Sequence, residues 1–395
     1  ISPARKIIHR TDRDKVKPRK RPASIQYRTI DGSYNNIASP NLGASHEQLT
    51  RLVDAAYADG IASLAGPNRP SARDISNHVV ALAFETESLP NKLKQSDFLW
   101  QWGQFVDHDI DLTDGIDPPE PQNITVPADD VYFLPGSEIP FNRSIYDSST
   151  GIDSPRQQLN EITAWIDASN VYGSDSERAN AIRTLDGSGK LKTSDGNLLP
   201  FNTFGLANAG DNGENSASLF LAGDVRANEQ IGLTVMHTLF MREHNRLVDQ
   251  LSARHPGWSG EKLYQKARQL VGAQMQDITF NEFLPALFGE DAITPYRGYN
   301  SNIDPTISNL FSTAAYRFGH SALSSTILRL DADGNTSSFV DLPLRNSFFS
   351  PWRLTAEDSL EPILRGLAAQ QCQTIDNYLV EDVRSFLFGI PAAGG

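Results

Sequence analysis

The sequence predicts a mainly α-helical protein, with a helical core, long irregular loops and little strand. Apolar residues recur at helical spacing in several long stretches, of which 96–110, 229–251 and 260–288 are the clearest. Long segments rich in Gly, Pro, Asn and Ser lie between them, and strand-like alternation is scarce. The length of 395 residues suits one large domain or two ordinary ones, with enough chain for a substantial core.

Composition excludes several classes of protein. The net charge of −13 argues against general nucleic-acid binding. No stretch approaches the roughly 18 apolar residues of a membrane-spanning helix, so no transmembrane segment is expected. The single cysteine, Cys372, excludes an intrachain disulfide and a thiolate cluster. The chain begins at Ile1 without a recognisable leader, which was either removed or never present.

The first half of the chain is predicted to contain one dominant helix. Residues 1–24 are basic with few core-forming side chains and predict a flexible arm, for which a solvated tail is favoured over a site for an acidic surface. A single domain is expected over 25–395, beginning with loops and short helices such as 47–57. Ser96 is a candidate N-cap of the 96–110 helix. Residues 111–155 then read as a long, proline-rich, irregular segment.

The second half is predicted to be built from four helices after an irregular stretch over 185–222. We expect these helices over 229–251, over 260–288, over 306–326 and over 361–388. The first of them carries two histidines seven residues apart, His237 and His244. A metal site is disfavoured there because no third ligand stands at ligand spacing, and hydrogen-bonded structural histidines are commoner.

The end of the 96–110 helix carries an unusual group of polar residues. Gln104 and His108 are four apart and share a face, while Asp107 and Asp109 flank His108 and point to its two sides. A histidine beside carboxylates suits proton transfer, and the carboxylates suit a hard cation. The competing interpretation is a solvated acidic helix end, and from this segment alone the two are evenly matched.

A second group of oxygen-bearing side chains stands at alternate positions. Thr163, Asp167 and Ser169 would share one side of an extended or looping segment. Their oxygens suit Ca²⁺, which takes six to eight oxygen ligands including backbone carbonyls. Ordinary turn chemistry explains the same residues, so the pattern alone is weak.

Several blocks in the same order resemble the animal-type haem peroxidases of the peroxidase–cyclooxygenase superfamily. They include Asp-His-Asp at 107–109, Gly-Asp-Val-Arg-Ala-Asn-Glu at 223–229 and Arg-Phe-Gly-His at 317–320, with longer blocks at 233–247 and 274–285. The resemblance runs from about Tyr27 to Leu387. It implies the mainly α fold of that family, a haem b cofactor and a bound calcium ion.

The resemblance assigns catalytic roles to three residues. His108 matches the distal histidine, which takes a proton from hydrogen peroxide and returns it to the leaving oxygen. Arg226 matches the distal arginine, whose fixed charge stabilises the charge that develops as the O–O bond breaks. Gln104 matches the glutamine that helps to hold water or halide on the distal side.

The resemblance also implies residues that hold the haem. His320 matches the proximal ligand of the haem iron, and Arg317 matches an arginine that pairs with a haem propionate. Asp107 and Glu229 match the two carboxylates that form ester links to haem methyls, although they would otherwise only hydrogen-bond to nearby groups. Gln230 stands where one mammalian branch has a methionine, so a sulfonium link is not expected and strong chloride oxidation is disfavoured.

The calcium ligands implied by the resemblance include the alternating oxygens described above. Asp109, Thr163, the carbonyl of Trp165, Asp167 and Ser169 match the family's site, where the ion would be structural and would position the helix end next to His108.

One expected residue lies outside the sequence. In the family, the proximal histidine donates to an asparagine on a segment that follows the position of Gly395. A separate chain would carry this segment, the sequence would be a fragment, or the segment would be lost, with weaker haem binding in the last case.

The resemblance implies a function with two alternatives. The implied enzyme is a haem peroxidase that uses hydrogen peroxide to oxidise iodide, bromide, thiocyanate or phenols through an oxoferryl intermediate. Secretion is also implied, and the sequons at Asn123, Asn142 and Asn335 matter only in a source that glycosylates. A fatty-acid dioxygenase is disfavoured, because those relatives have a tyrosine three residues before the proximal histidine and Tyr316 is four before. An inactive binding or adhesion domain is the other alternative.

Overall fold

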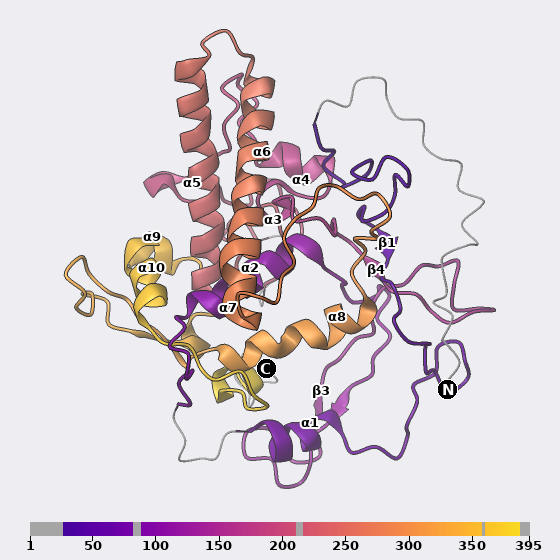
Figure 1. Ribbon diagram of the computed structural model, residues 1–395. Helices are drawn as coiled ribbons and strands as arrows, with labels where there is room; N and C mark the ends of the chain where they lie inside the picture. Colours follow the sequence, from indigo (N-terminus) through magenta and orange to yellow (C-terminus); the bar gives the residue numbers. More distant parts are fainter. Residues whose placement is uncertain (1–26, 82–87, 211–215, 358–359, 388–395) are drawn as a thin grey trace.

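The computed structural model describes residues 27–81, 88–210, 216–357 and 360–387 (Figure 1). The predicted basic arm, residues 1–24, lies outside the described residues. Where the chain is described, it is mainly helical, and its strands are two residues long and pair only as small antiparallel ribbons. The predicted fold class, mainly α with long irregular loops, is therefore confirmed.

The elements of the described residues are as follows. The α-helices are α1 (Ala72–Ile75), α2 (Phe98–Ile110), α3 (Ser169–Tyr172), α4 (Ser176–Ala181), α5 (Ile231–Arg254), α6 (Gly260–Ile278), α7 (Leu284–Phe288), α8 (Asn309–Thr313), α9 (Arg353–Ala356), α10 (Leu360–Ala369) and α11 (Glu381–Arg384). Two π-helical turns, η1 (Ser76–Val80) and η3 (Thr279–Phe283), and three 3₁₀ segments, η2 (Asp195–Asn197), η4 (Ala315–Ala322) and η5 (Leu344–Asn346), complete the helical set. The strand pairs are β1 (Glu47–Gln48) with β4 (Leu159–Asn160), β2 (Ile124–Thr125) with β3 (Glu138–Ile139), and β5 (Thr326–Ile327) with β6 (Leu342–Pro343).

The core lies where α2 packs against the long α5–α6 hairpin, which projects from the body of the molecule (Figure 1). Trp102 and Phe105 of α2 are buried, as their spacing predicts, and the Phe105 ring stacks on Phe240 of α5 with centroids 5.0 Å apart. Met236 and Leu247 complete the buried face of α5. This packing holds the last turn of α2, with His108, deep inside the protein.

The predicted 260–288 helix is correct in extent but contains a π-helical turn, η3, between α6 and α7. The turn places two buried side chains against α2. Thr279 accepts a hydrogen bond from Trp102 Nε1 at 3.2 Å, and the Phe283 ring lies in ordinary contact distance of Gly103, 3.5 Å from where a Cβ would stand. The π turn thus sets which residues of this long helix face the helix that bears His108.

Two predictions for the first half are wrong. Residues 47–57 do not form a helix, because Glu47 and Gln48 pair with Asn160 and Leu159 and the rest follows as irregular chain. Ser96 is not the N-cap of α2. Asp97 occupies that position without a side-chain capping bond, and Ser96 contributes only its carbonyl, which accepts from Leu99 N at 2.9 Å.

Two predicted helices of the second half are broken. The 306–326 segment contains α8 and the 3₁₀ segment η4, separated at Ala314, whose backbone is not helical. The 361–388 segment contains α10 and the short α11 with extended chain between them. Gln371 bridges to Ser96 and Gln373 to Pro90 there, so tertiary pairing overrides helical periodicity.

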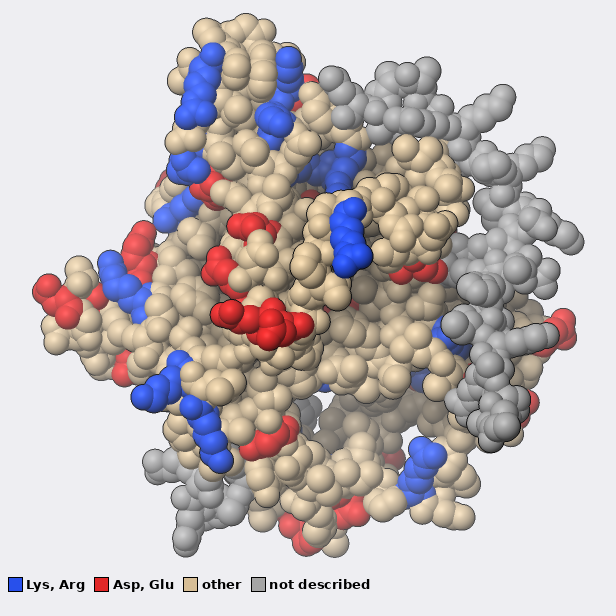
Figure 2. Space-filling view, viewed as in Figure 1, with Lys and Arg blue, Asp and Glu red and all other residues tan. Residues whose placement is uncertain are grey.

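The surface carries no continuous basic region on the face shown in Figure 2, where Lys and Arg are scattered among Asp and Glu over the described residues. Among the described helices, none is both long enough and apolar enough to cross a bilayer.

Candidate active site

One cavity of about 230 Å³ brings together the residues predicted to act in catalysis and in haem binding. It lies between α2, the segment before α5, and η4, and Leu99, Trp100 and Phe348 contribute apolar walls. Its polar lining includes Gln104, Asp107, His108, Arg226, Glu229, Arg317 and His320. These residues come from three distant parts of the sequence, so only the fold makes them neighbours.

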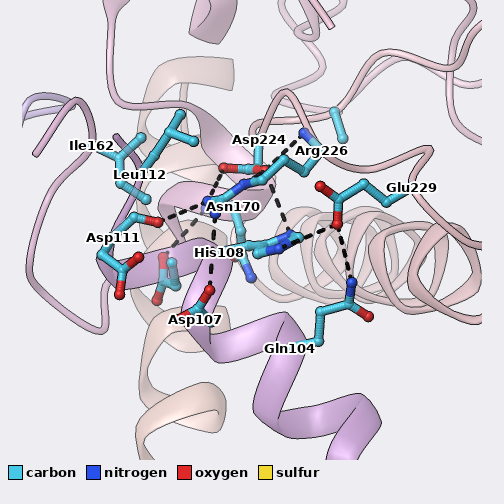
Figure 3. Close-up of polar contacts among 12 residues, drawn as sticks. Gln104, Asp107, His108, Asp111, Leu112, Ile162, Asn170, Asp224, Arg226 and Glu229 are labelled. Carbon is cyan, nitrogen blue, oxygen red and sulfur yellow. Dashed lines mark hydrogen bonds and ion pairs between the residues drawn. The ribbon is translucent and has the colours of Figure 1, made fainter. Parts of the chain in front are cut away.

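His108 is 4% exposed and stands between two carboxylates (Figure 3). Its Nδ1 lies 3.6 Å from Asp224 Oδ1, and its Nε2 lies 3.7 Å from Glu229 Oε2. Burial, reinforced by the positive charge of Arg226, lowers the pKa of His108 well below its ordinary value. The imidazole is therefore neutral at pH 7 and is able to accept a proton.

Arg226 is fixed next to His108 by hydrogen bonds that use most of its guanidinium group. Its Nε and Nη2 donate to Asp224 Oδ1 and Oδ2, each at 2.9 Å, and Nη2 also donates to the Asp111 carbonyl at 2.9 Å. Burial disfavours the charged forms of both side chains, but the attraction between the two charges has the larger effect. Asp224 therefore raises the pKa of Arg226, and Arg226 holds the pKa of Asp224 below its usual range. A permanent positive charge thus lies within the site.

Asp107 faces the opposite side of the helix end from Asp109 and meets two arginines. Its Oδ2 lies 3.2 Å from Arg317 Nη1 and 3.9 Å from Arg226 Nη1. Burial, together with the neighbouring charge of Asp111, raises the pKa of Asp107 to about 7. Its Oδ1 is buried without a hydrogen-bond partner, which leaves one carboxyl oxygen available to a group in the cavity.

Glu229 lies across the cavity from Asp107 and is half-buried. Gln104 Nε2 donates to its Oε2 at 3.2 Å, so the predicted Gln104–His108 face of α2 meets this carboxylate (Figure 3). Burial raises the pKa of Glu229 to about 7. Asp107 and Glu229 are thus two carboxyl groups with raised pKa values beside one buried arginine.

His320 lies on η4 and is exposed, and its ring makes no hydrogen bond with the residues that the structure describes. Its segment is anchored to α2 by Tyr316, whose hydroxyl donates to the Gly103 carbonyl at 2.9 Å. Arg317 Nε donates to the Ser312 carbonyl at 2.8 Å, which ties η4 to α8. The imidazole of His320 is therefore positioned at the cavity with both ring nitrogens available.

The residues predicted to bind calcium form a second cluster on the other side of α2, in which all but the half-buried Trp165 are buried. Ser169 Oγ donates to Asp109 Oδ1 at 2.9 Å, and Thr163 Oγ1 donates to Asp167 Oδ1 at 3.1 Å. The Trp165 carbonyl accepts from Asp167 N at 2.9 Å. Burial and the charge of Asp167 raise the pKa of Asp109 to about 7, and Asp167 Oδ2 is buried without a partner.

Sequence reasoning missed two residues that organise the site, Asp224 and Asp111. Asp224 stands two positions before Arg226 in one of the quoted blocks, and this alternate spacing was a usable signal that the two side chains share a side. Asp111 pairs with Arg317 at 3.4 Å and follows the end of α2, where nothing in the sequence distinguishes it from a loop aspartate.

Of the two histidines of α5, His244 is hydrogen-bonded, as expected of a structural histidine, whereas both ring nitrogens of His237 are buried without a partner. His244 interacts with the Tyr172 hydroxyl at 2.8 Å and with the Gly189 carbonyl at 3.0 Å, and the His237 ring packs edge-on against Phe105. Within the described ranges, no three His, Cys, Asp or Glu side chains are grouped so that they could hold a metal. The calcium cluster falls outside this criterion because it has only two carboxylates.

Comparison with known proteins gives consistent results. The family model described as animal haem peroxidase matches residues 27–395. Lactoperoxidase of Mesocricetus auratus is 37% identical over 408 residues, which cover 92% of this chain and 57% of the relative. The peroxidasin homolog of Mus musculus is 37% identical over 385 residues, covering 87% of this chain and 26% of the relative. The chain thus spans only part of these relatives.

Solved structures have the same fold. Peroxidase A from Dictyostelium discoideum has a TM-score of 0.84 and 29% identity, covering 94% of this chain and 74% of that one. A fatty acid alpha-dioxygenase from Oryza sativa has a TM-score of 0.67 and 22% identity, covering 88% and 59%, which shows shared fold alone. The family match over nearly the whole described chain is decisive: the protein belongs to the animal haem peroxidase family.

Proposed function

We propose that this protein is a haem peroxidase that uses hydrogen peroxide to oxidise small anions, such as iodide, bromide and thiocyanate, or phenols. The observation that carries the proposal is the pairing of a buried, neutral His108 with the permanently charged Arg226 in one cavity that also contains His320. A neutral base beside a fixed cation suits cleavage of a peroxide bond, which needs a proton moved and a developing negative charge stabilised.

The residues present fit a haem. His320 has a ring without hydrogen-bond partners among the described residues at the cavity, and the walls include Leu99 and Phe348. Arg317, which pairs with Asp107 and Asp111 and is 39% exposed, would also pair with a propionate. Asp107, whose Oδ1 has no partner, and Glu229 would hold the haem by contact or by ester links. When bound through His320, the haem iron would supply the redox chemistry.

The chain's own residues handle the proton and the charge. The ionised Asp224 faces Nδ1 of His108, which favours the tautomer with hydrogen on Nδ1 and a free lone pair on Nε2. Nε2 accepts a proton from hydrogen peroxide and returns it to the departing oxygen. Arg226 cannot lose its own proton, so it stabilises the developing anion without competing for the proton that His108 carries.

Calcium belongs to the same proposal. The cluster of Asp109 and Asp167 buries two carboxylates side by side with an unsatisfied oxygen, which is costly without a cation. Hydroxyls of Thr163 and Ser169 and the carbonyl of Trp165 complete an oxygen donor set of the kind that Ca²⁺ prefers. Because Asp109 follows His108 directly, the ion would hold the catalytic base in place.

Three finer features complete the proposal. Gln230 at the position that would carry a methionine excludes a sulfonium link to the haem. In the family the proximal histidine donates to an asparagine, and for His320 that residue would come from a separate chain, would belong to a longer form of this chain, or would be lost. Secretion is supported by the sequons, and a mobility shift on glycosidase treatment of the native protein tests it.

The test of the proposed function is steady-state oxidation of iodide and of guaiacol by hydrogen peroxide. The haem-loaded protein is compared with free haemin at the same concentration. A haem-dependent rate well above free haemin supports the proposal, and a rate equal to free haemin rejects it. Rejection with normal folding would favour the inactive binding domain instead.

A fatty-acid dioxygenase is the second candidate, because fatty acid alpha-dioxygenases share the fold. It is disfavoured by Tyr316, which stands four residues before His320 and whose hydroxyl is engaged with the Gly103 carbonyl. Oxygen uptake with linoleate in the absence of peroxide would overturn this preference.

A further inference from the structure

A chain of side-chain amides runs from the N-terminus of α5 to the cavity. Gln230, the N-cap of α5, is 2% exposed, and its Oε1 accepts a hydrogen bond from Gly232 N at 2.6 Å. Its Nε2 donates to Gln101 Oε1 at 2.7 Å and to Gln104 Oε1 at 3.0 Å. Gln104 Nε2 in turn donates to Glu229.

The direction of this chain is set by a backbone group. The amide N–H of Gly232 can only donate, so the oxygen of Gln230 must face it and the NH₂ of Gln230 must face away. Gln104 must then turn its oxygen to Gln230 and its NH₂ toward Glu229. One N–H at a helix N-terminus thereby fixes the polarity of two glutamines and presents a hydrogen-bond donor at the cavity.

Local packing shows that this amide cluster is closely fitted. A Cβ added to Gly232 would stand 2.9 Å from Gln230 Oε1 and even closer to Gln101 Oε1. Only glycine at this position lets the Gln230 and Gln101 side chains come so near to the backbone. Gln101 Nε2 is buried and has no partner, so Gln101 contributes to the cluster as an acceptor alone.

We infer that Gln230 is a positioning residue, which acts through Gln104 to keep an N–H donor rather than a carbonyl directed at the distal cavity. The ligand class it favours is a small anion that accepts hydrogen bonds. The inference rests on the proposed function, because the anion would bind in the cavity that the haem shares.

The test compares two buried Gln→Glu substitutions. In Gln230→Glu the side chain still accepts from Gly232 but no longer donates, so Gln104 turns over and presents its carbonyl to the cavity. In Gln101→Glu the same charge enters the same cluster, but the acceptor for Gln230 is kept. The surface substitution Gln250→Glu, at the other end of α5, controls for the added charge on the helix.

The readout is the dissociation constant of fluoride for the ferric haem protein, from the shift of its Soret band. We expect Gln230→Glu to weaken fluoride binding at least about tenfold more than Gln101→Glu, since a hydrogen bond to a charged group is worth that factor or more. Equal constants for the two variants would overturn the inference. A wild-type protein without a Soret band would instead reject the proposed function.

A second measurement does not depend on haem. Gln230→Leu, Gln104→Leu and the double variant are unfolded with urea in the apo-protein. The inferred contact predicts that the two substitutions are coupled by at least about threefold in the unfolding equilibrium constant. Additive effects would overturn the inference even if no haem binds.

Discussion

The carboxylate of Asp224 accepts two parallel hydrogen bonds from Arg226, each 2.9 Å long, in an interior where both groups are at most 9% exposed. The same Asp224 oxygen, Oδ1, lies 3.6 Å from His108 Nδ1. One carboxylate thus orients both groups that the proposed reaction needs.

Asp224→Asn is therefore expected to damage stability and peroxide cleavage together. Loss of one charge leaves Arg226 buried beside a neutral amide, at a cost of about 3 kcal/mol. Urea unfolding measures the loss, and stopped-flow mixing with peroxide measures the rate. Asp249→Asn is the matched control, because its pair with Lys190 is exposed and contributes little. Equal effects of the two substitutions would contradict the role of Asp224.

His108→Ala is expected to slow the reaction with peroxide by at least about two orders of magnitude, the usual contribution of a positioned acid–base group. His78→Ala, which removes an exposed histidine, should leave the rate unchanged. Rapid-mixing absorbance at the Soret band measures both. A wild-type rate in His108→Ala would remove this residue from the mechanism.

Removal of calcium is expected to lower the unfolding temperature, because it would leave Asp109 and Asp167 buried side by side without a counter-ion. Calorimetry before and after chelation, with calcium then magnesium restored, measures the effect. Asp167→Asn should abolish the calcium response, and the exposed Asp277→Asn should keep it. An unfolding temperature that changes neither on chelation nor in Asp167→Asn would argue against the calcium site.

Asp97, at the start of α2, gives a prediction for pH. Burial raises its pKa to about 7, so the folded protein holds a proton there that the unfolded chain loses near pH 4. The associated stability is present below about pH 4 and is lost as the pH rises through 7, by on the order of 3–4 kcal/mol. In Asp97→Asn this part of the pH dependence should vanish, and in Asp249→Asn it should remain. Urea unfolding at pH 4.5 and 7.5 tests the difference between variants.

Gly366→Ala is expected to destabilise the protein by about 2 kcal/mol or more. An added Cβ on α10 would stand far inside van der Waals contact of the Leu328 carbonyl, and backbone atoms cannot move aside cheaply. Gly257→Ala, where a Cβ meets open space, should be neutral or slightly stabilising. Urea unfolding distinguishes the two, and a harmless Gly366→Ala would mean that α10 shifts without cost.

The sequence predicted which residues would lie close together better than it predicted the bounds of the helices around them. Residues 107, 108, 226, 229 and 317–320 carry distinctive chemistry at fixed spacings, and the fold places them at one cavity, while Asp109 lies on the other side of α2. Helical periodicity, in contrast, does not reveal that Gln371 and Gln373 form β-bridges with Ser96 and Pro90. It also does not reveal that the non-helical backbone of Ala314 interrupts the helix before His320. Asp111 was missed because the sequence does not distinguish a loop aspartate from one in a buried ion pair, whereas the position of Asp224, two residues before Arg226, was a signal that remained unused.

The π-helical turn of residues 279–283 has a consequence for how this protein tolerates change. It adds a residue to a turn, so that Met275, Thr279 and Phe283, four apart, remain buried on one side. Because the π turn contains that extra residue, deleting one residue within it would restore a regular α-helix and leave α7 in nearly the same orientation, whereas deleting one residue from α6 would rotate everything after it by about 100°. The π turn is therefore the place in this long helix where the loss of one residue disturbs the packing of the following turns least.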